Sequence, residues 1–396
     1  MIESIFIGMS GLSGYSRGLR VIANNTANLN TPGFKGSALQ FADMSYSTSG
    51  TAGGTFSSFG GQFGYGVTTT SSTLNFRQGE LRQTGNDFDL AVDGQGLFIL
   101  RDKEGNLTYT RAGLFAFDDD GFLVNPGNAA RVMARGQGGT LTDINISALR
   151  LDPPKATGTV VFAGNLSSTE VNKIVNGVKV IDAAGAEHQL SITFTSQSDV
   201  QAGRWKLTLH DGATEVGTAT MDFVDGKPTP ETAKPSFRYT PAGKPEMTVV
   251  MDFSGQITSF ASGTLSTLAV SSQDGFLSGT ISKLGIDDSG VLQFEYANGN
   301  KAQGSQLALA RFDSPELLTA VGGNAFKASE GASIDQGVAG EGSFGSLRSG
   351  TVEISNVDLS QEFSDLVIMQ RGYQASSQVI STANEMLQEL FRMTGR

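Results

Sequence analysis

The two ends of this chain carry apolar side chains at helical spacing, and almost everything between them has the pattern of short β-strands. Residues 1–30 and 359–396 show the helical spacing, whereas glycine, Asn-Gly and Asp-Gly punctuate the middle. Strands of this kind are joined by such turns, and an amphipathic helix needs a second apolar face against its own. The sequence therefore predicts a mixed, mainly β fold: two β-rich domains plus a coiled-coil-like α-helical pair formed by the N- and C-terminal segments.

The N-terminal segment has one apolar stripe that shares its helix with four glycines. The stripe comprises Ile5, Met9, Leu12, Tyr15, Leu19, Ile22 and Ala23, at spacings of mostly three and four. Gly8, Gly11, Gly14 and Gly18 each cost ~1 kcal/mol relative to alanine in an isolated helix. We therefore expect a helix that needs a partner. It should end near Asn28–Asn30, because Thr31-Pro32-Gly33 cannot continue it.

The C-terminal segment has a more regular seam. Its members are Leu366, Met369, Tyr373, Ser376, Ile380, Ala383, Leu387 and Leu390. Sustained steps of three and four are typical of a coiled coil. We favour pairing with the N-terminal helix, because Ser376 and Ala383 allow close approach; an ordinary amphipathic helix on a globular core is the alternative. Asp358 and Ser360 offer N-cap oxygens, and Glu362 is placed to complete a capping arrangement.

A long stretch near the N-terminus has no charge at all, since none occurs between Asp43 and Arg77. Ser, Thr and Gly dominate residues 45–72, a composition typical of flexible linkers. Five aromatic residues nevertheless indicate that the stretch docks on another surface: Tyr46, Phe56, Phe59, Phe63 and Tyr65. A disordered loop with scattered aromatic residues is the alternative.

The β-rich middle divides into two parts. Leu90–Val92 and Leu97–Leu100 flank Asp93-Gly94, and a second apolar pair flanks Asp118–Gly121, so each predicts a hairpin. Proline-containing segments suggest the boundaries. The predicted domains are a terminal helical domain (1–30 and 359–396), an extended linker segment (31–74 and 351–358), an inner β domain (75–148 and 272–350) and an inserted outer β domain (149–271).

The composition and the residue pattern argue against nucleic-acid binding, metal binding, membrane insertion and catalysis. The net charge is −11 with no basic block, which makes nucleic acid a poor partner. There is no cysteine, the two histidines have no acidic cluster at metal-ligand spacing, and Asp118–Gly121 does not fit a calcium loop. No stretch reaches the ~18 apolar residues of a membrane helix, and the first residues do not form a signal peptide. We expect no membrane insertion, no catalytic, cofactor-binding or metal residues, and no enzyme.

Both termini contain long motifs. Residues 23–35, Ala-Asn-Asn-Thr-Ala-Asn-Leu-Asn-Thr-Pro-Gly-Phe-Lys, closely resemble the N-terminal signature of the flagellar rod, hook and hook-associated proteins. Residues 355–363, Ser-Asn-Val-Asp-Leu-Ser-Gln-Glu-Phe, and 369–375, Met-Gln-Arg-Gly-Tyr-Gln-Ala, resemble the C-terminal signature of the same family. Residues 88–98 and 110–115 are similar to its β-domain segments.

Within that family, the length, the inserted region and Phe162–Leu166 resemble the hook-type members. The resemblance implies a homo-oligomeric helical tube outside the cell in the bacterial flagellum, a flexible universal joint that transmits torque from rod to filament. It implies export by the flagellar type III apparatus without a cleaved signal peptide. It also implies contacts with a distal rod protein, a hook cap protein and a hook–filament junction protein. The alternatives are a rod-type axial protein and, from another class, a secreted β-rich adhesin.

The seam residues and the N-terminal signature together form the predicted subunit interface. Its members are Leu12, Tyr15, Leu19, Ile22, Asn25, Asn28, Phe34, Leu366, Met369, Tyr373, Ile380, Ala383, Leu387 and Leu390.

Overall fold

The computed structural model describes residues 2–48 and 62–394, which form two compact units. Unit 1 comprises Met1–Ser147, Gly285–Gln293 and Gln303–Arg396, and unit 2 comprises Ala148–Leu284 and Phe294–Ala302. The first boundary falls within the 3-10 helix Ser147–Leu149, and the others fall within β23 (Gly279–Ile286), β24 (Val291–Tyr296) and β25 (Lys301–Leu307). The inserted domain predicted from sequence spans 149–271, whereas unit 2 also contains 148, 272–284 and 294–302.

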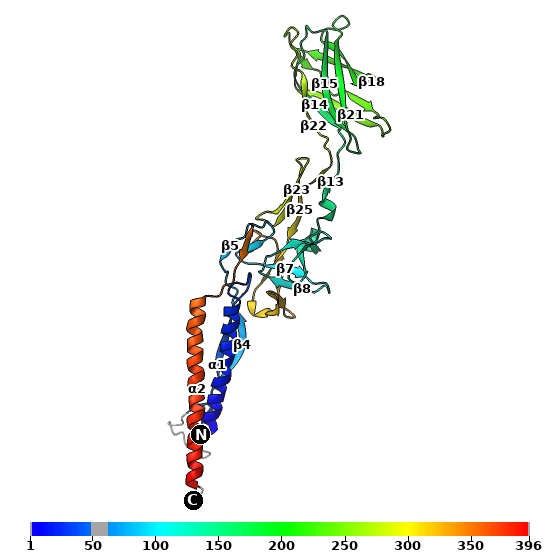
Figure 1. Cartoon of the computed structure of the whole chain (residues 1–396). Helices are drawn as coiled ribbons and strands as arrows, with labels where there is room; N and C mark the ends of the chain where they lie inside the picture. Colours follow the sequence, from blue (N-terminus) through cyan, green and yellow to red (C-terminus); the bar gives the residue numbers. More distant parts are fainter. Residues whose placement is uncertain (1, 49–61, 395–396) are drawn as a thin grey trace. The chain divides into compact units, whose positions relative to one another are not determined.

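Unit 1 contains two long helices that lie side by side, α1 (Ile2–Ala27) and α2 (Leu359–Thr394) (Figure 1). The helix pair is thus confirmed. The α1 helix stops at Ala27 and passes into turns, close to its predicted end.

The N-terminus of α2 is capped by Asp358, whose Oδ1 accepts hydrogen bonds from Ser360 N (2.8 Å) and Gln361 N (3.2 Å). The predicted N-cap role of Ser360 is wrong, because Ser360 lies inside the helix. Glu362 stands one residue beyond the position that closes a capping box, and its carboxylate instead accepts a hydrogen bond from Asn25 (2.9 Å).

The predicted linker segment contains a hairpin that packs on α1. Strands β1 (Ser37–Asp43) and β4 (Val67–Leu74) pair antiparallel and contact that helix, and β2 (Tyr46–Thr48) pairs with β3 (Gln62–Gly64). The rings of Tyr15 and Phe41 lie 5.7 Å apart across the α1–β1 contact.

Of the five aromatic residues that we expected to dock, Tyr65 is exposed. Phe56 and Phe59 lie outside the described residues, as do the side chains of Tyr46 and Phe63. Docking of this stretch therefore stays a prediction.

The β part of unit 1 packs around Leu97, Ile99, Tyr109, Met133, Ala308, Ala310, Leu318 and Phe326. Its strands are β5 (Leu81–Gln83), β6 (Leu90–Asp93), β7 (Leu97–Arg101), β8 (Leu107–Thr110), β9 (Ala116–Phe117), β10 (Leu123–Val124), β11 (Arg131–Arg135), β12 (Leu141–Asp143), β26 (Leu309–Phe312), β27 (Leu318–Gly322), β28 (Ala325–Ala328), β29 (Ile334–Gly337), β30 (Ser346–Ser349) and β31 (Thr351–Glu353). The core side chains come from β7, β8, β11, β26, β27 and β28 and from Ala308; Leu97 and Ile99, two residues apart on β7, share one face of that strand.

One of the two predicted hairpins forms and the other does not. Strands β9 and β10 pair across the acidic turn, where Asp118 Oδ1 accepts a hydrogen bond from Phe122 N (2.7 Å). The hairpin across Asp93-Gly94 is wrong, because β6 pairs with β30 while β7 pairs with β8 and β11. The intervening loop bonds elsewhere: Gln95 O accepts from Gly345 N, and Gly94 O accepts from the Arg111 guanidinium.

Unit 2 has two sheets, in which most neighbouring strands are antiparallel, around one apolar core. One sheet has the order β20-β21-β14-β22 and the other β15-β16-β17-β18-β19. Their inward side chains include Trp205, Phe162, Phe194 and Phe253, all almost completely buried. The strands are β14 (Thr159–Asn165), β15 (Asn172–Ile181), β16 (Glu187–Ser196), β17 (Arg204–Asp211), β18 (Thr214–Val224), β19 (Lys227–Pro228), β20 (Ser236–Tyr239), β21 (Met247–Thr258) and β22 (Ala269–Gln273), with β13 (Leu151–Asp152) pairing to β23.

Candidate functional site

The contact between the two helices is lined by glycine on the α1 side. A Cβ atom added to Gly8 would lie 2.7 Å from Ile380 Cγ1, and one added to Gly18 would lie 2.8 Å from Met369 Sδ. At Gly11 the added atom would lie 2.5 Å from Ser376 Oγ. Each separation is shorter than van der Waals contact between packed atoms. The side chains of α2 therefore occupy the space that larger residues on α1 would need.

At one position the roles of the two helices are exchanged, and a side chain of α1 packs against a glycine of α2. The ring of Tyr15 on α1 lies against Gly372 of α2, at a position where no Cβ would fit. Gly14 faces strand β1 instead of α2, because its added Cβ would lie 3.0 Å from Cε1 of Phe41. We had interpreted the α1 glycines only as residues that weaken an isolated helix. The structure shows that they also form most of the buried face of that helix, together with Ile22 and Asn25.

The eleven predicted interface residues of the helical seams fall into three groups. Ile22 and Ala383 are buried within the chain, and Tyr373 and Leu390 are 42% and 45% exposed. The half-buried residues are Leu12, Tyr15, Leu19, Leu366, Met369, Ile380 and Leu387. The Tyr15 ring fills the space beside Gly372, so Gly372 also belongs to the face of α2 that meets α1.

Both helices carry apolar side chains that this pairing leaves exposed. On α1 these are Ile2, Phe6, Ile7 and Met9, and on α2 they include Phe363, Val367, Ile368, Tyr373, Val379, Met386 and Met393. Phe6 and Ile368 are 62% and 60% exposed. Contiguous exposed apolar surface marks interaction sites on soluble proteins. Sequence reasoning missed most of the α2 set because it followed one seam only, although the spacing from Val379 through Met386 to Met393 is a heptad.

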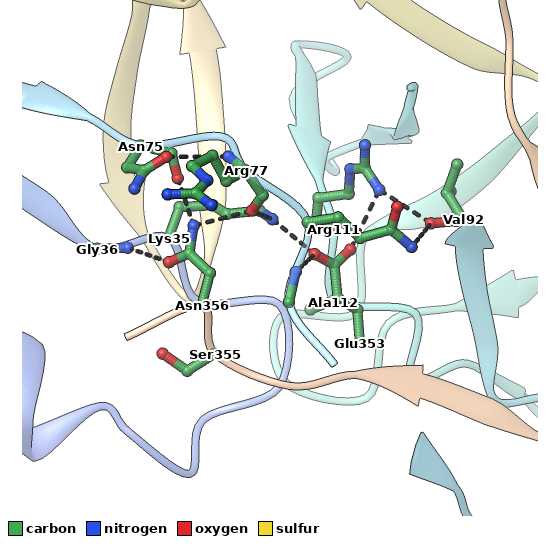
Figure 2. Close-up of polar contacts among 12 residues, drawn as sticks. Lys35, Gly36, Asn75, Arg77, Val92, Arg111, Ala112, Glu353, Ser355 and Asn356 are labelled. Carbon is green, nitrogen blue, oxygen red and sulfur yellow. Dashed lines mark hydrogen bonds and ion pairs between the residues drawn. The ribbon is translucent and has the colours of Figure 1, made fainter. Parts of the chain in front are cut away.

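A buried charged cluster joins the residues just after α1 to those just before α2. Glu353 Oε1 accepts from Lys35 Nζ (2.6 Å), and its Oε2 accepts from Arg111 Nη1 (3.1 Å) (Figure 2). The side chains of Lys35 and Glu353 are 0% exposed and that of Arg111 is 7% exposed. Burial lowers the pKa of both Lys35 and Arg111, and Glu353 opposes that effect. We call Lys35, Arg111 and Glu353 the junction cluster.

Backbone groups add further hydrogen bonds to the cluster, although Arg111 Nε has no hydrogen-bond partner among the residues that the structure describes. Lys35 Nζ also donates to Arg77 O (2.8 Å), and Gly79 N donates to Glu353 Oε1 (2.8 Å). The Arg111 guanidinium donates to Val92 O (3.0 Å) as well. Burying a carboxylate that accepts several hydrogen bonds costs far less free energy than burying an unpaired one. Removing it would leave the charges of Lys35 and Arg111 buried without a partner. The cluster thus ties the chain near both helices to the β part of unit 1. Sequence reasoning did not single out these three residues; Lys35 closes the N-terminal motif, which was the available signal.

Two asparagines hold the terminal motifs together beside the junction cluster. Asn25 Nδ2 donates to Ser37 O (2.8 Å) and to Glu362 Oε1 (2.9 Å), and Asn25 Oδ1 accepts from Ser37 N (3.1 Å). Asn356 Oδ1 accepts from Gly36 N (2.9 Å), while its Nδ2 donates to two backbone carbonyls of the segment before β5 (Figure 2). Burial raises the pKa of Glu362, and the hydrogen bond from Asn25 opposes the rise.

The three predicted residues of the N-terminal motif, Asn25, Asn28 and Phe34, lie within or just after the C-terminal end of α1. Asn25 is 3% exposed, so its side chain is used within the chain. Asn28 donates to Asn24 O (2.9 Å) and accepts from Thr31 Oγ1 (3.1 Å), which closes the C-terminal end of α1. Phe34 is half-buried and lines a cavity together with Asn28.

Within residues 2–48 and 62–394, no group of acidic or histidine side chains is arranged to hold a metal ion. No helix of that described part is long and apolar enough to cross a membrane. His188 lies in unit 2, where its Nε2 is 3.1 Å from Asp182 Oδ2.

Three segments match known family descriptions. Residues 5–35 match "Flagella basal body rod protein", and residues 91–173 match "Flagellar hook protein FlgE/F/G D1 domain". Residues 348–393 match "Flagellar basal body rod FlgEFG protein C-terminal". The first and last of these segments contain Asn25, Lys35, Glu353 and Asn356, the residues that the structure brings together.

Relatives match over nearly the whole chain. The flagellar hook protein FlgE of Borreliella burgdorferi is 31% identical, over 99% of this chain and 100% of that protein. The FlgE proteins of Treponema pallidum and Escherichia coli are 30% and 29% identical, over 98% and 97% of this chain and 98% of each relative. The crystal structure of Helicobacter pylori FlgE2 aligns with a TM-score of 0.49 at 14% identity, over 69% of this chain and 100% of that one, a similarity too low to add to the assignment. The chain belongs to the flagellar hook protein family.

Proposed function

We propose that this chain is the subunit of the bacterial flagellar hook and that it polymerises into a flexible tube, a universal joint that transmits torque from rod to filament. The observation that carries the proposal is the apolar surface that α1 and α2 leave exposed after pairing with each other. The family membership supplies the kind of assembly. The role is structural, and we assign no catalytic activity to it.

Self-assembly follows from the physics of that surface. Removing apolar area from water stabilises association by roughly 25 cal/mol per Å². A single heterologous contact that repeats without closing generates a helical polymer. Because α1 buries mostly glycine against α2, the pair gains little from its own packing, and neighbouring copies supply the missing burial.

The interface that we propose is centred on the exposed residues. Of the residues predicted from sequence, Tyr373 is exposed, and Leu12, Leu19, Leu366 and Leu387 are exposed in part. Ile22, Asn25 and Ala383 support the contact from within the chain. Phe6, Phe363, Val367 and Ile368 join the proposed surface.

The junction cluster suits the transmission of force. A buried charged cluster with several hydrogen bonds holds one geometry, because a shift of any member would leave a charge unpaired. We infer that the cluster passes load between the helices and the β part of unit 1. Export by the flagellar type III apparatus, without cleavage of a signal peptide, and an extracellular place in the flagellum belong to the same proposal. The partners would be a distal rod protein below, a hook–filament junction protein above and a hook cap protein during growth.

Electron microscopy of the purified chain tests the proposal, with Ile368→Asp as the decisive variant. A charge placed at this exposed apolar position must be buried when copies assemble, which is costly without a partner. We expect curved tubes from the unchanged chain and none from Ile368→Asp, while the variant stays a folded monomer by circular dichroism. Gln370→Asp, at an exposed polar position of the same helix, is the matched control and should form tubes. Normal assembly of Ile368→Asp would contradict the proposed interface, and straight tubes would favour a rod-type role.

A further inference from the structure

The chain contains two Asn-Gly pairs, and both lie in unit 2. Asn176-Gly177 belongs to β15, whereas Asn298-Gly299 lies in the turn between β24 and β25. Gly177 and Gly299 are both exposed and both have positive φ, 71° and 86°, and a Cβ atom added to either would meet no atom within 4 Å. Because the two glycines have the same surroundings, a difference in reactivity between the pairs must come from the asparagine side chains and from the hydrogen bonds around them.

The side chain of Asn176 is not held by the fold. The register of β15 against β16 shifts between Val175 and Val178, so Asn176 and Gly177 lie in a β-bulge, where the ladder of hydrogen bonds is interrupted. The side chain of Asn176 is exposed, and it makes no hydrogen bond with any part of the chain that the structure describes. Its amide carbon is therefore free to rotate toward the backbone nitrogen of Gly177.

The side chain of Asn298 is held on both sides of the same bond. Its Nδ2 donates to Asp152 Oδ2 (2.9 Å) and to Leu277 O (2.8 Å). The backbone nitrogen of Gly299 donates to Tyr296 O (2.9 Å). The amide carbon and the backbone nitrogen next to it are thus fixed by separate partners, and bringing them together would break hydrogen bonds that cost free energy to lose.

We propose that Asn176 deamidates spontaneously in the folded chain, whereas Asn298 is protected. The backbone nitrogen of Gly177 attacks Cγ of Asn176, so that an N–Cγ bond forms and the Cγ–Nδ2 bond breaks. The attacking nitrogen gives up its proton, and Nδ2 leaves as ammonia. Water then opens the five-membered succinimide ring at either carbonyl, which gives aspartate or isoaspartate. Glycine favours the attack because it has no Cβ atom to hinder the approach.

The reaction changes both charge and backbone. Either product carries a negative charge where the chain had a neutral amide, and isoaspartate also adds one backbone atom to β15. A bulge already holds extra backbone within its strand, so the pairing with β16 on both sides can persist. The inference goes beyond the proposed function and does not depend on assembly, so the free chain is sufficient to test it.

Peptide mapping by mass spectrometry tests the contrast between the two sites. The full chain is incubated in mildly alkaline buffer, folded or unfolded in guanidinium chloride, and each peptide is followed for the gain of one mass unit that accompanies deamidation. In the denaturant both sites should react at similar rates. On folding, Asn176 should stay within about threefold of that rate, and Asn298 should slow about tenfold or more, which is ~1.4 kcal/mol of activation free energy. Equal slowing of both sites, or a faster reaction at Asn298, would overturn the inference.

A pair of variants tests whether Asn176 is the main site in the folded chain. Asn176→Gln should lower the overall rate of mass gain about threefold or more, because glutamine must close a larger ring. Asn172→Gln is the matched control, since Asn172 is an exposed asparagine of the same strand that precedes Lys173 rather than glycine. It should leave the overall rate unchanged. Unchanged thermal unfolding checks that both variants keep the fold, and equal rates of mass gain in the two would refute the assignment of Asn176.

Discussion

Unit 2 and the helix pair of unit 1 bury their apolar residues in opposite ways. The sheets of unit 2 enclose large side chains such as Trp205, Phe162 and Phe253, which are almost fully covered by their own chain. The helix pair buries glycine, and leaves Phe6 and Ile368 mostly exposed. A region that covers its own apolar surface folds by itself, whereas the other reaches its full stability only against neighbours. The comparison predicts a chain whose two regions unfold independently.

The chain offers a separate signal for each region. Trp205 is its single tryptophan and lies in the core of unit 2, so tryptophan fluorescence reports on that unit. Both α-helices of the described residues belong to unit 1, so circular dichroism at 222 nm reports mainly on the helix pair. The following predictions use these two signals in urea unfolding.

The largest effect is expected from Glu353→Gln. The variant keeps the shape of the side chain but leaves Lys35 and Arg111 buried without their carboxylate, which costs ~3–5 kcal/mol in comparable buried ion pairs. The circular dichroism transition should move to lower urea while the Trp205 transition stays in place. Glu341→Gln removes an exposed partner of Arg135 and should cost less than ~1 kcal/mol. A shift of both signals in Glu353→Gln would break the comparison, since it would show that the regions unfold as one.

A smaller effect is expected from Gly8→Val. The added side chain meets Ile380, and overpacking of this kind costs ~1–3 kcal/mol. Ser13→Val places the same side chain at an exposed position of α1 and should change the free energy of unfolding by less than ~0.5 kcal/mol. The difference between the two variants, read by circular dichroism, isolates the cost of the contact from helix propensity. Equal stability of the two would mean that the glycine face is not closely packed.

The smallest effect is the pH dependence that Asp182 gives to unit 2. The backbone N–H of Ala186, the His188 side chain and the backbone N–H of Ala184 hold the pKa of Asp182 at about 2. Because this pKa is depressed on folding, its contribution is complete above the unfolded pKa near 4 and is lost as pH falls toward 2. The Trp205 transition should weaken over that range, and less so in Asp182→Asn. Asp199→Asn, at an exposed loop position, is the control. An identical pH profile for Asp182→Asn and the unchanged chain would remove Asp182 as the cause.

Periodicity and capping chemistry were enough to predict the helices, the Asp358 cap and the β9–β10 hairpin, because each depends on neighbours in sequence. The glycine face was not predicted, because a residue without a side chain gives no apolar signal. Gly372 of α2, which lies against the Tyr15 ring, was missed for the same reason. The junction cluster and the β6–β30 pairing depend on contacts between residues more than 200 positions apart in the chain, such as Arg111 and Glu353. No local pattern encodes such contacts.

In the contact between the helices, α1 contributes mainly glycines and α2 contributes mainly side chains. This difference has a consequence for sequence variation. On α2, Met369, Ser376 and Ile380 could shrink and leave a small void, which neighbouring atoms fill in part. On α1, Gly8, Gly11 and Gly18 have no side chain that could become smaller, and there is no room beside them for a Cβ atom. Substitutions that accumulate by drift should therefore collect on one helix while the glycines of the other stay unchanged.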